Sequence, residues 1–170
     1  MEIRQMMKTR QAIKQLADIY RTVWNNGDNQ LVDRFWRHAH YEGYAAFAIM
    51  NESNAPVGFV YGYRSLPGQY YHDLLNRALA EVGKQEWLHH CFEIVELAIL
   101  PEYRGQGLAK QLLDTSLNNV DYHTAILTTK VKNKPARALY DSHGWSVLKN
   151  PFYPQENESP FIIMGKTLAH

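Results

Sequence analysis

Two glycines at a change from strand to helix are the first residues whose spacing predicts chemistry. The segment Arg104-Gly105-Gln106-Gly107-Leu108-Ala109 follows the β-rich run 92–100 and precedes the helical periodicity of 108–118. Glycine lets backbone N–H groups come close to a ligand, and a helix N-terminus offers unpaired donors and the positive end of a dipole. The segment therefore predicts a pyrophosphate site, with a strand-to-helix turn that binds nothing as the alternative.

The side chains of this segment fit an anionic ligand. Arg104 supplies positive charge at the entrance, and the small Ala109 leaves room for a ligand beside the first helical turn. Lys110, one residue further into the helix, adds a backbone N–H or a charge to the phosphates, although an exposed helical lysine is equally expected.

The elements that must position this segment can be predicted from periodicity and turn residues. Strand-like runs fall at 1–7, 44–50, 57–63, 92–100, 124–129, 145–148 and 161–165, and helical runs at 9–24, 30–40, 108–118 and 134–142. Thr9 is the expected cap of the first helix, and 51–56 is the expected hairpin loop between two antiparallel strands. Residues 66–90 contain a further helical run and interrupt the sheet pattern, as an insertion of the kind that often carries specificity.

Length and composition exclude several classes of protein. At 170 residues, with 45% hydrophobic and 21% charged residues, the chain is expected to form one globular domain. No apolar run approaches the ~20 residues that cross a bilayer, and the N-terminus lacks a secretory signal, so we expect a cytoplasmic protein without a membrane partner. Cys91 is the only cysteine, which excludes an intrachain disulfide and cysteine-rich zinc sites and favours a buried apolar role.

The charge and histidine patterns argue against a nucleic-acid partner and against a metal. The 18 Lys and Arg residues balance 17 Asp and Glu residues, which is no signature of polyanion binding. A local basic cluster, interpreted either as a solvated loop or as a phosphate contact, comprises Lys130, Lys132, Lys134 and Arg137. The pairs His38/His40 and His89/His90 lack a carboxylate at ligand spacing, so no metal site is predicted. His72, His89 and His90 are expected to be exposed, with a proton relay near the insertion as the alternative.

Three motifs in order along the chain resemble one family. Residues 104–109 match the Arg/Gln-x-x-Gly-x-Gly/Ala signature of the GCN5-related N-acetyltransferases (GNAT), and 93–103 looks like the fourth strand of that family and its exit. The segment 128–133, followed by Ala136, Tyr140, Gly144 and Trp145, resembles the next motif.

The resemblance implies a fold, a domain organisation and a co-substrate. The fold would be an α/β (α+β) GNAT fold, with a mixed central sheet of about 6–7 strands flanked by about 4–5 helices. A single acetyltransferase domain would cover 1–170, with the 66–90 helical insertion between strands 3 and 4, and acetyl-CoA would be the co-substrate.

Acyl transfer to an amine needs a neutral nitrogen, stabilisation of an oxyanion and a proton for the departing thiolate. Glu93 and Glu96 are the candidates for the general base. Three positions apart in a strand, they should face opposite sides unless a bulge intervenes, so we expect only one to reach the substrate. Resemblance favours Glu93, which matches the catalytic glutamate of the histone-acetylating branch, whereas Glu96 stands where many small-molecule members carry an acid. Each could instead be a structural carboxylate.

The resemblance also implies roles for the remaining site residues. A backbone N–H near Leu97, Ala98 or Ile99 would stabilise the oxyanion beside the thioester carbonyl. Tyr140 matches the family tyrosine that protonates or hydrogen-bonds the coenzyme sulfur, with packing onto the sheet as the alternative. Asn133 matches the residue that bonds the pantetheine arm, and it also suits a helix cap.

We therefore expect an N-acetyltransferase that moves the acetyl group of acetyl-CoA to a primary amine, by direct transfer through a tetrahedral intermediate. The sequence does not specify whether the acceptor is a small molecule or a peptide. Aromatic candidates for its binding walls are Trp24, Trp36, Tyr70, Tyr71, Trp87, Phe152 and Tyr153. The alternatives are an acyl-CoA sensor without turnover and a protein, peptide or tRNA acetyltransferase. A homodimer formed through a sheet edge is a further expectation from the resemblance.

Overall fold

A computed structural model of the chain describes residues 1–26, 28–156 and 158–168, which form two compact units. The first unit is Met1–Tyr63 with Ile94–Val120, and the second is Arg64–Glu93 with Asp121–His170. Strand β4 (Cys91–Ile99) gives Cys91–Glu93 to the second unit and its remaining residues to the first. That the whole of 1–170 is one domain stays a prediction.

The first unit combines strands from the N-terminal half with three α-helices. Its elements are β1 (Glu2–Gln5), α1 (Arg10–Trp24), α2 (Leu31–His38), β2 (Ala45–Met50), nearly all of β3 (Pro56–Arg64), the end of β4, the short 3-10 helix η2 (Pro101–Tyr103) and α4 (Leu108–Asn118). β2 pairs antiparallel with β1 and with β3. The predicted cap of α1 is confirmed, because the extended Thr9 accepts a hydrogen bond of 3.1 Å from the Ala12 N–H with its hydroxyl.

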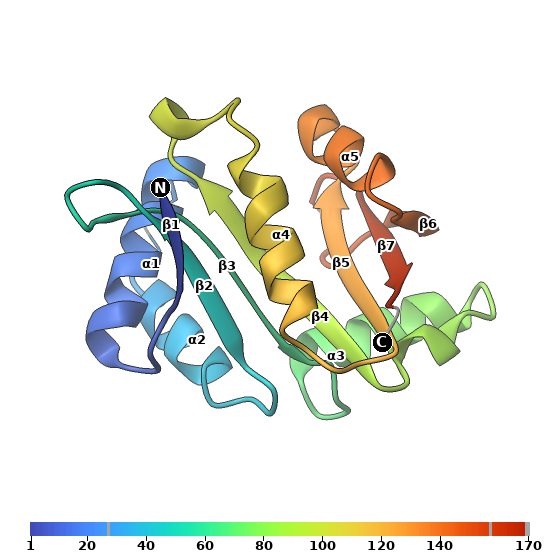
Figure 1. Cartoon of the computed structure of the whole chain (residues 1–170). Helices are drawn as coiled ribbons and strands as arrows, with labels where there is room; N and C mark the ends of the chain where they lie inside the picture. The colour runs from blue at the N-terminus through green and yellow to red at the C-terminus, as the bar shows by residue number, and fades with distance from the viewer. Residues whose placement is uncertain (27, 157, 169–170) are drawn as a thin grey trace. The chain divides into compact units, whose positions relative to one another are not determined.

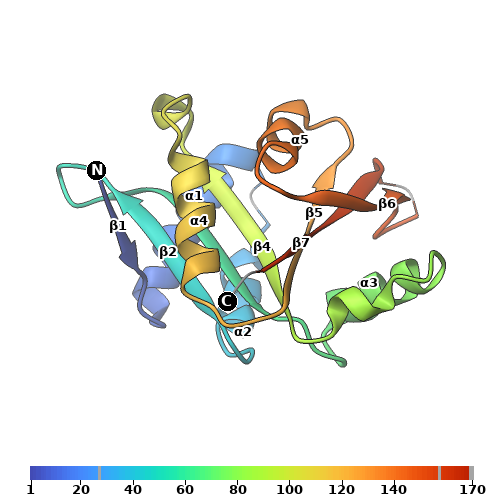
Figure 2. The ribbon, with the colours of Figure 1, turned by 45° about the vertical axis from the view of Figure 1, so that its right-hand side comes forward.

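Helices cover both faces of these strands. α1 and α2 pack on the face formed by alternate residues of β2 and β3, including Ala48, Phe59 and Tyr61, and Ala98 of β4 joins the same core. α4 packs against β2 from the opposite face (Figures 1 and 2). Successive side chains of a strand point to opposite faces, and helices cover both faces here. β2 and β3 are therefore buried nearly throughout, which explains their continuous apolar runs.

β3 and β4 approach each other closely within the first unit. The Leu100 N–H donates to the Val57 carbonyl at 2.9 Å. A Cβ added at Gly58 would lie 2.6 Å from Ile99 Cδ1 and 3.2 Å from the Ala98 carbonyl oxygen, so a larger residue here would require Ile99 and the β4 backbone to shift. The close pairing fixes which residues of β4 stand opposite which residues of β3.

The second unit contains the insertion and the C-terminal strands. Its elements are α3 (Tyr70–Ala80), the 3-10 helix η1 (Gln85–Leu88), the beginning of β4, β5 (Thr124–Lys130), α5 (Lys134–Asp141), β6 (Ser146–Phe152) and β7 (Phe161–Thr167). β4 pairs with β5 in parallel over Cys91–Glu93, and β7 pairs antiparallel with both β5 and β6. The buried Cys91 packs with Leu75, Leu79 and Ile126, which confirms its predicted apolar role.

The strand order confirms the predicted fold class. The strands are hydrogen-bonded in the order β1-β2-β3-β4-β5-β7-β6, and the sheet is mixed because β4–β5 is parallel while the pairs β1–β2, β2–β3, β5–β7 and β6–β7 are antiparallel. Seven strands and five α-helices lie in the part of the chain that the structure describes. The insertion between β3 and β4 contains a helix, α3, as predicted.

Candidate functional site

The predicted phosphate segment leaves β4 through η2 and enters α4 with two glycines in the left-handed region. Gly105 has a φ of 78° and Gly107 a φ of 75°. Gly107 is the N-cap residue of α4, and no side chain caps this helix. A Cβ added at either glycine would meet no atom within 4 Å, and 104–107 are all exposed. The N-terminus of α4 is therefore an open helix end of the kind that binds anions.

The side chains around this helix end divide into an entrance and an anchor. Arg104 is exposed, and its Nε donates to the Ile99 carbonyl at 3.2 Å. This hydrogen bond holds the guanidinium group beside the segment. Leu108 is buried and fixes the first turn of α4 in the core. Lys110 Nζ lies 2.9 Å from Asp114 Oδ2 in an exposed pair along the helix. Binding of an anion by the backbone of this helix end, by Arg104 or by Lys110 stays a prediction.

The two candidate base residues of β4 have different surroundings. Glu93 is buried, with 4% of its surface exposed, and belongs to the second unit. Glu96 is half-buried and belongs to the first unit. Gly58 of β3 lies beside Ile99 of β4. Tyr61 is three residues after Gly58, and Glu96 is three residues before Ile99, so Tyr61 and Glu96 stand opposite each other. Glu96 therefore lies on the face that α1 and α2 cover.

Electrostatics around Glu96 support this placement. Burial raises the pKa of Glu96 to about 7, against an opposing effect of Arg34 on α2. Tyr20 on α1 and Tyr61 on β3 each have a pKa raised by burial and, second, by the charge of Glu96. A carboxyl group that is half ionised near neutral pH can exchange protons with an amine.

The residues around Glu96 are functional candidates that the sequence analysis did not find. Tyr20, Arg34 and Tyr61 come from three elements separated by many residues, so no local motif joins them. One signal was present in the alternation Phe59, Tyr61, which places a tyrosine hydroxyl on a buried strand face where a polar partner is required.

The segment predicted to bind the oxyanion follows Glu96 directly. Leu97 is half-buried, whereas Ala98 and Ile99 are buried at 3% and 8% exposure. Ala98 and Ile99 lie against Gly58 of β3. Which backbone N–H of this segment would meet a thioester oxygen stays a prediction.

The second unit holds the other two predicted site residues, both on α5. Asn133 is the N-cap, and its side-chain oxygen accepts a hydrogen bond of 3.3 Å from the Ala136 N–H. Tyr140 is buried, its ring centroid 5.8 Å from that of Trp145, and its carbonyl accepts from the Trp145 N–H. The structure thus brings Asn133 and Tyr140 onto one helix, with Asn133 serving as a cap as the alternative interpretation predicted.

The aromatic residues proposed as acceptor walls separate into exposed and packed groups. Trp24, Tyr70 and Tyr153 are exposed. Tyr71, Trp87 and Phe152 pack in or against the core of the second unit. The Arg10 guanidinium lies 4.4 Å from the centre of the Trp36 ring. An acceptor contact by any of these residues stays a prediction.

Two histidines differ from the expectation. His72 was expected to be exposed but is buried at 6% exposure, and its Nδ1 lies 2.7 Å from the Ser65 hydroxyl. His90, which lines a pocket of about 280 Å³ together with His72 and His89, is half-buried. Among residues 1–26, 28–156 and 158–168, no group of three or more His, Cys, Asp or Glu side chains is placed to hold a metal ion. None of the helices described is long and apolar enough to cross a membrane.

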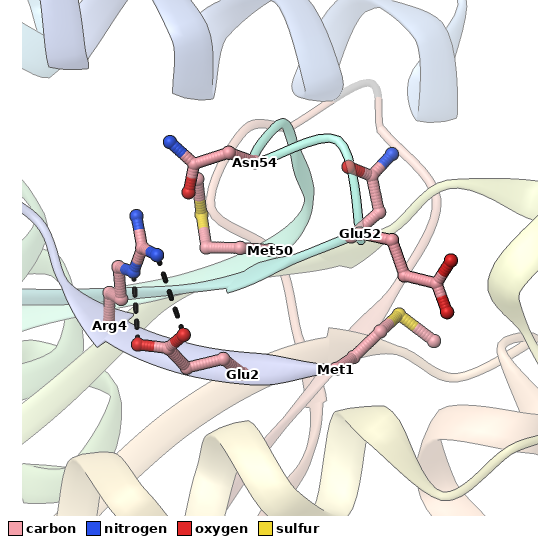
Figure 3. Close-up of a pocket in the computed structure, with 7 residues that line it drawn as sticks. Met1, Glu2, Arg4, Met50, Glu52 and Asn54 are labelled. Atoms are coloured by element: carbon pink, nitrogen blue, oxygen red, sulfur yellow. Dashed lines mark hydrogen bonds and ion pairs between the residues drawn. The ribbon is translucent and has the colours of Figure 1, made fainter.

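A larger cavity, of about 600 Å³, lies at the edge of the first unit. Figure 3 shows it between β1 and the β2–β3 hairpin, where Arg4 forms an ion pair with Glu2 of the same strand. Asn51, which also lines it, donates to the Tyr103 hydroxyl at 3.5 Å. None of the predicted site residues lines this cavity.

The sequence matches the acetyltransferase (GNAT) family over residues 10–145. The chain therefore belongs to the GNAT family, which confirms the predicted resemblance.

Individual relatives support the same family. A stretch of 125 residues is 30% identical to the GCN5-like protein acetyltransferase Rv2170 of Mycobacterium tuberculosis; it covers 68% of this chain and 61% of that protein, so the chain spans less than two thirds of the relative's length. The fold is shared with the aminoglycoside 6'-acetyltransferase type Ii, with a TM-score of 0.73, 17% identity and coverage of 100% of this chain and 99% of the other. It is also shared with the ribosomal-protein-S18-alanine N-acetyltransferase of Escherichia coli, with a TM-score of 0.71, 16% identity and coverage of 99% and 96%.

Proposed function

We propose that the protein is an N-acetyltransferase that transfers the acetyl group of acetyl-CoA to the primary amine of a small molecule or a peptide. The observation that carries this proposal is the N-terminus of α4, where a glycine replaces any capping side chain and a second glycine precedes it. Family membership supplies the reaction class, and this helix end supplies a place for the pyrophosphate.

The residues present fit the co-substrate. The first N–H groups of α4 have no intrahelical acceptor, so phosphate oxygens can accept from them, and the dipole of the helix favours the negative charge. Arg104 adds a charged donor beside them. Acetyl-CoA supplies the activated acyl group as a thioester. Asn133 is proposed to bind its pantetheine arm and Lys110 to contribute to the phosphates.

Glu96 is proposed as the general base in preference to Glu93. An alkyl ammonium with a pKa of about 10.4 costs about 4 to 5 kcal/mol to deprotonate at pH 7. A base with a pKa of about 7 is well matched to accept this proton near neutral pH. Glu93 is buried more deeply, and a direct catalytic role for it stays a prediction.

The proposed step conserves atoms and charge. Glu96 first takes one proton from the acceptor ammonium and passes it to solvent, which leaves a neutral amine. The amine nitrogen then forms a bond to the thioester carbonyl carbon, a backbone N–H of Leu97, Ala98 or Ile99 donates to the oxyanion of the tetrahedral intermediate, and the second proton of the nitrogen passes to Glu96. The C–S bond then breaks, the carbonyl re-forms as an amide, and the thiolate takes a proton, for which Tyr140 is the proposed donor.

The helix-end site can be tested with a pair of matched glycine variants. Gly107→Ala places a methyl group where the pyrophosphate is proposed to bind, and Gly83→Ala makes the same change at a φ of 69° with equally open surroundings in the second unit. Both variants incur a similar conformational cost of about 1–2 kcal/mol, because alanine disfavours the left-handed region. By isothermal titration calorimetry with acetyl-CoA, we expect Gly107→Ala to bind about 10-fold or more weakly and Gly83→Ala to bind like the wild type. Equal affinities for the two variants would contradict the proposed site.

A further inference from the structure

The carboxyl group proposed as the base stands next to a hydrogen-bonded tyrosine and histidine. Tyr61 is 1% exposed, and its hydroxyl lies 2.7 Å from His38 Nδ1. The two rings are 5.9 Å apart between centroids, and His38 also contacts the ring of Tyr63. This pair joins the end of α2 to the middle of β3, on the face where Glu96 lies.

The position of Tyr61 makes its hydroxyl proton important for Glu96. Cross-strand neighbours on one face have Cβ atoms about 4.5–5.5 Å apart, within which a phenol and a carboxylate interact directly or through one water. Glu96 and Tyr61 also interact electrostatically, since the Glu96 charge contributes to the raised pKa of Tyr61. Among the described residues, the Tyr61 hydroxyl is hydrogen-bonded to His38.

We propose that His38 and Tyr61 are a positioning pair for Glu96: His38 Nδ1 accepts a hydrogen bond from the Tyr61 hydroxyl, so that this hydroxyl does not donate to the Glu96 carboxylate. The inference rests on the proposed role of Glu96 as general base. A carboxylate that receives a hydrogen bond is a weaker base, because the bond stabilises its ionised form. Because the Tyr61 hydroxyl is hydrogen-bonded to His38, Glu96 stays basic enough to take a proton from the amine.

The protonation of His38 is consistent with this role. Burial lowers the pKa of His38 to about 4, with further lowering by Arg37 and Arg34. His38 is thus neutral near pH 7, and a neutral imidazole has one nitrogen that accepts and one that donates. The proposal requires the tautomer in which Nδ1 accepts and Nε2 carries the hydrogen.

Other groups near Glu96 must be considered in any pH dependence. The titratable and charged groups that face Glu96, Tyr61 or His38 from the packed elements are Tyr20 of α1, Arg34, Arg37 and His38 of α2, Tyr41 and Tyr44 before β2, and Tyr61 and Tyr63 of β3. Arg34 lowers the pKa of Glu96, whereas burial raises the pKa values of Tyr20, Tyr44 and Tyr61 above the ordinary value of a tyrosine. Glu96 is therefore the group of this cluster expected to titrate near pH 7.

The test is a direct titration of Glu96 by carboxyl carbon NMR in four proteins without acetyl-CoA. In His38→Phe, which keeps an aromatic ring, the freed Tyr61 hydroxyl can donate to Glu96, and we expect the pKa of Glu96 to fall by about one unit. The double variant His38→Phe/Tyr61→Phe should return to the wild-type pKa, because no hydroxyl remains. The matched control is His40→Phe; His40 bonds the Trp36 carbonyl on the exposed side of the same segment, so its replacement should not change the titration of Glu96.

Three outcomes would overturn the proposal. The first is an unchanged Glu96 pKa in a folded His38→Phe protein, and the second is a fall that persists in the double variant. The third needs no variant: nitrogen NMR of wild-type His38 showing hydrogen on Nδ1 would mean that His38 donates to Tyr61. Both measurements are independent of turnover. If the protein transferred no acetyl group to any amine, the proposed function would fail while these results would still decide the role of the pair.

Discussion

Replacing Glu96 with glutamine should stabilise the protein at alkaline pH, because the folded chain holds this carboxyl proton more tightly than the unfolded chain. The pKa of Glu96 is raised from 4.5 to about 7 by burial. A group whose folded pKa is raised contributes stability that is complete below the unfolded pKa and is lost as pH rises through the folded pKa. The wild type therefore loses stability between about pH 4.5 and pH 7, and Glu96→Gln, which does not titrate, lacks this loss.

The size of the effect follows from the two pKa values. A shift of about 2.5 units at about 1.36 kcal/mol per unit gives a limiting difference of about 3 kcal/mol. The pH-dependent part of the advantage of Glu96→Gln over the wild type should be about 1 kcal/mol at pH 5 and about 3 kcal/mol at pH 8. Residues that titrate equally in both proteins cancel in this difference.

Urea unfolding at pH 5 and pH 8, followed by circular dichroism, measures this difference directly. Glu96→Asp is the matched control, since it keeps a carboxyl group at this position and should lose stability with rising pH as the wild type does. A free-energy difference between Glu96→Gln and the wild type that is the same at both pH values would refute the electrostatic account of Glu96.

Three further predictions concern other parts of the chain. Gly165→Ala should destabilise the protein by about 1–3 kcal/mol in thermal or urea unfolding, since its Cβ would lie 2.7 Å from Leu148 Cδ1 and 2.9 Å from the Trp87 ring; wild-type stability would show that these side chains relax freely. Cys91, whose pKa burial raises to about 12, should react with a thiol reagent only when the chain unfolds, and rapid labelling of the native protein would contradict its burial. Tyr140→Phe should lower kcat about 100-fold or more with little change in acetyl-CoA affinity, and an unchanged kcat would leave Tyr140 a packing residue.

Much of the fold could be predicted because local chemistry fixes its elements. α4 begins at Leu108 and ends at Asn118, as the helical periodicity predicts, and the Thr9 cap sets the start of α1. β6 runs to Phe152, beyond the end at Leu148 that the sequence predicts. The prediction is too short because Pro151 indicates a loop. Proline cannot donate to a strand ladder, but it is tolerated at an edge, and β6 is the last strand in the order.

The strand order and the surroundings of Glu96 could not be predicted from local patterns. Insertion of β7 between β5 and β6 depends on pairing over long separations, which the periodicity of a single strand does not specify. Likewise, alternation in β4 indicated that Glu93 and Glu96 differ in their surroundings, but not which of them meets the tyrosines. That distinction comes from the β3–β4 register, which places Tyr61 opposite Glu96.

The central claim is that this chain uses acetyl-CoA to acetylate an amine with Glu96 as the base. Its most direct test is acceptor-dependent thiol release from acetyl-CoA, measured at pH 8 with a thiol reagent against a panel of small primary amines and peptides with free N-termini; the buried Cys91 should contribute no background. The account predicts thiol release with at least one acceptor. In Glu96→Gln, the rate of release should fall by about 100-fold or more while the affinity for acetyl-CoA is retained. Tight binding of acetyl-CoA without acceptor-dependent release from any amine would contradict the account and identify an acyl-CoA sensor.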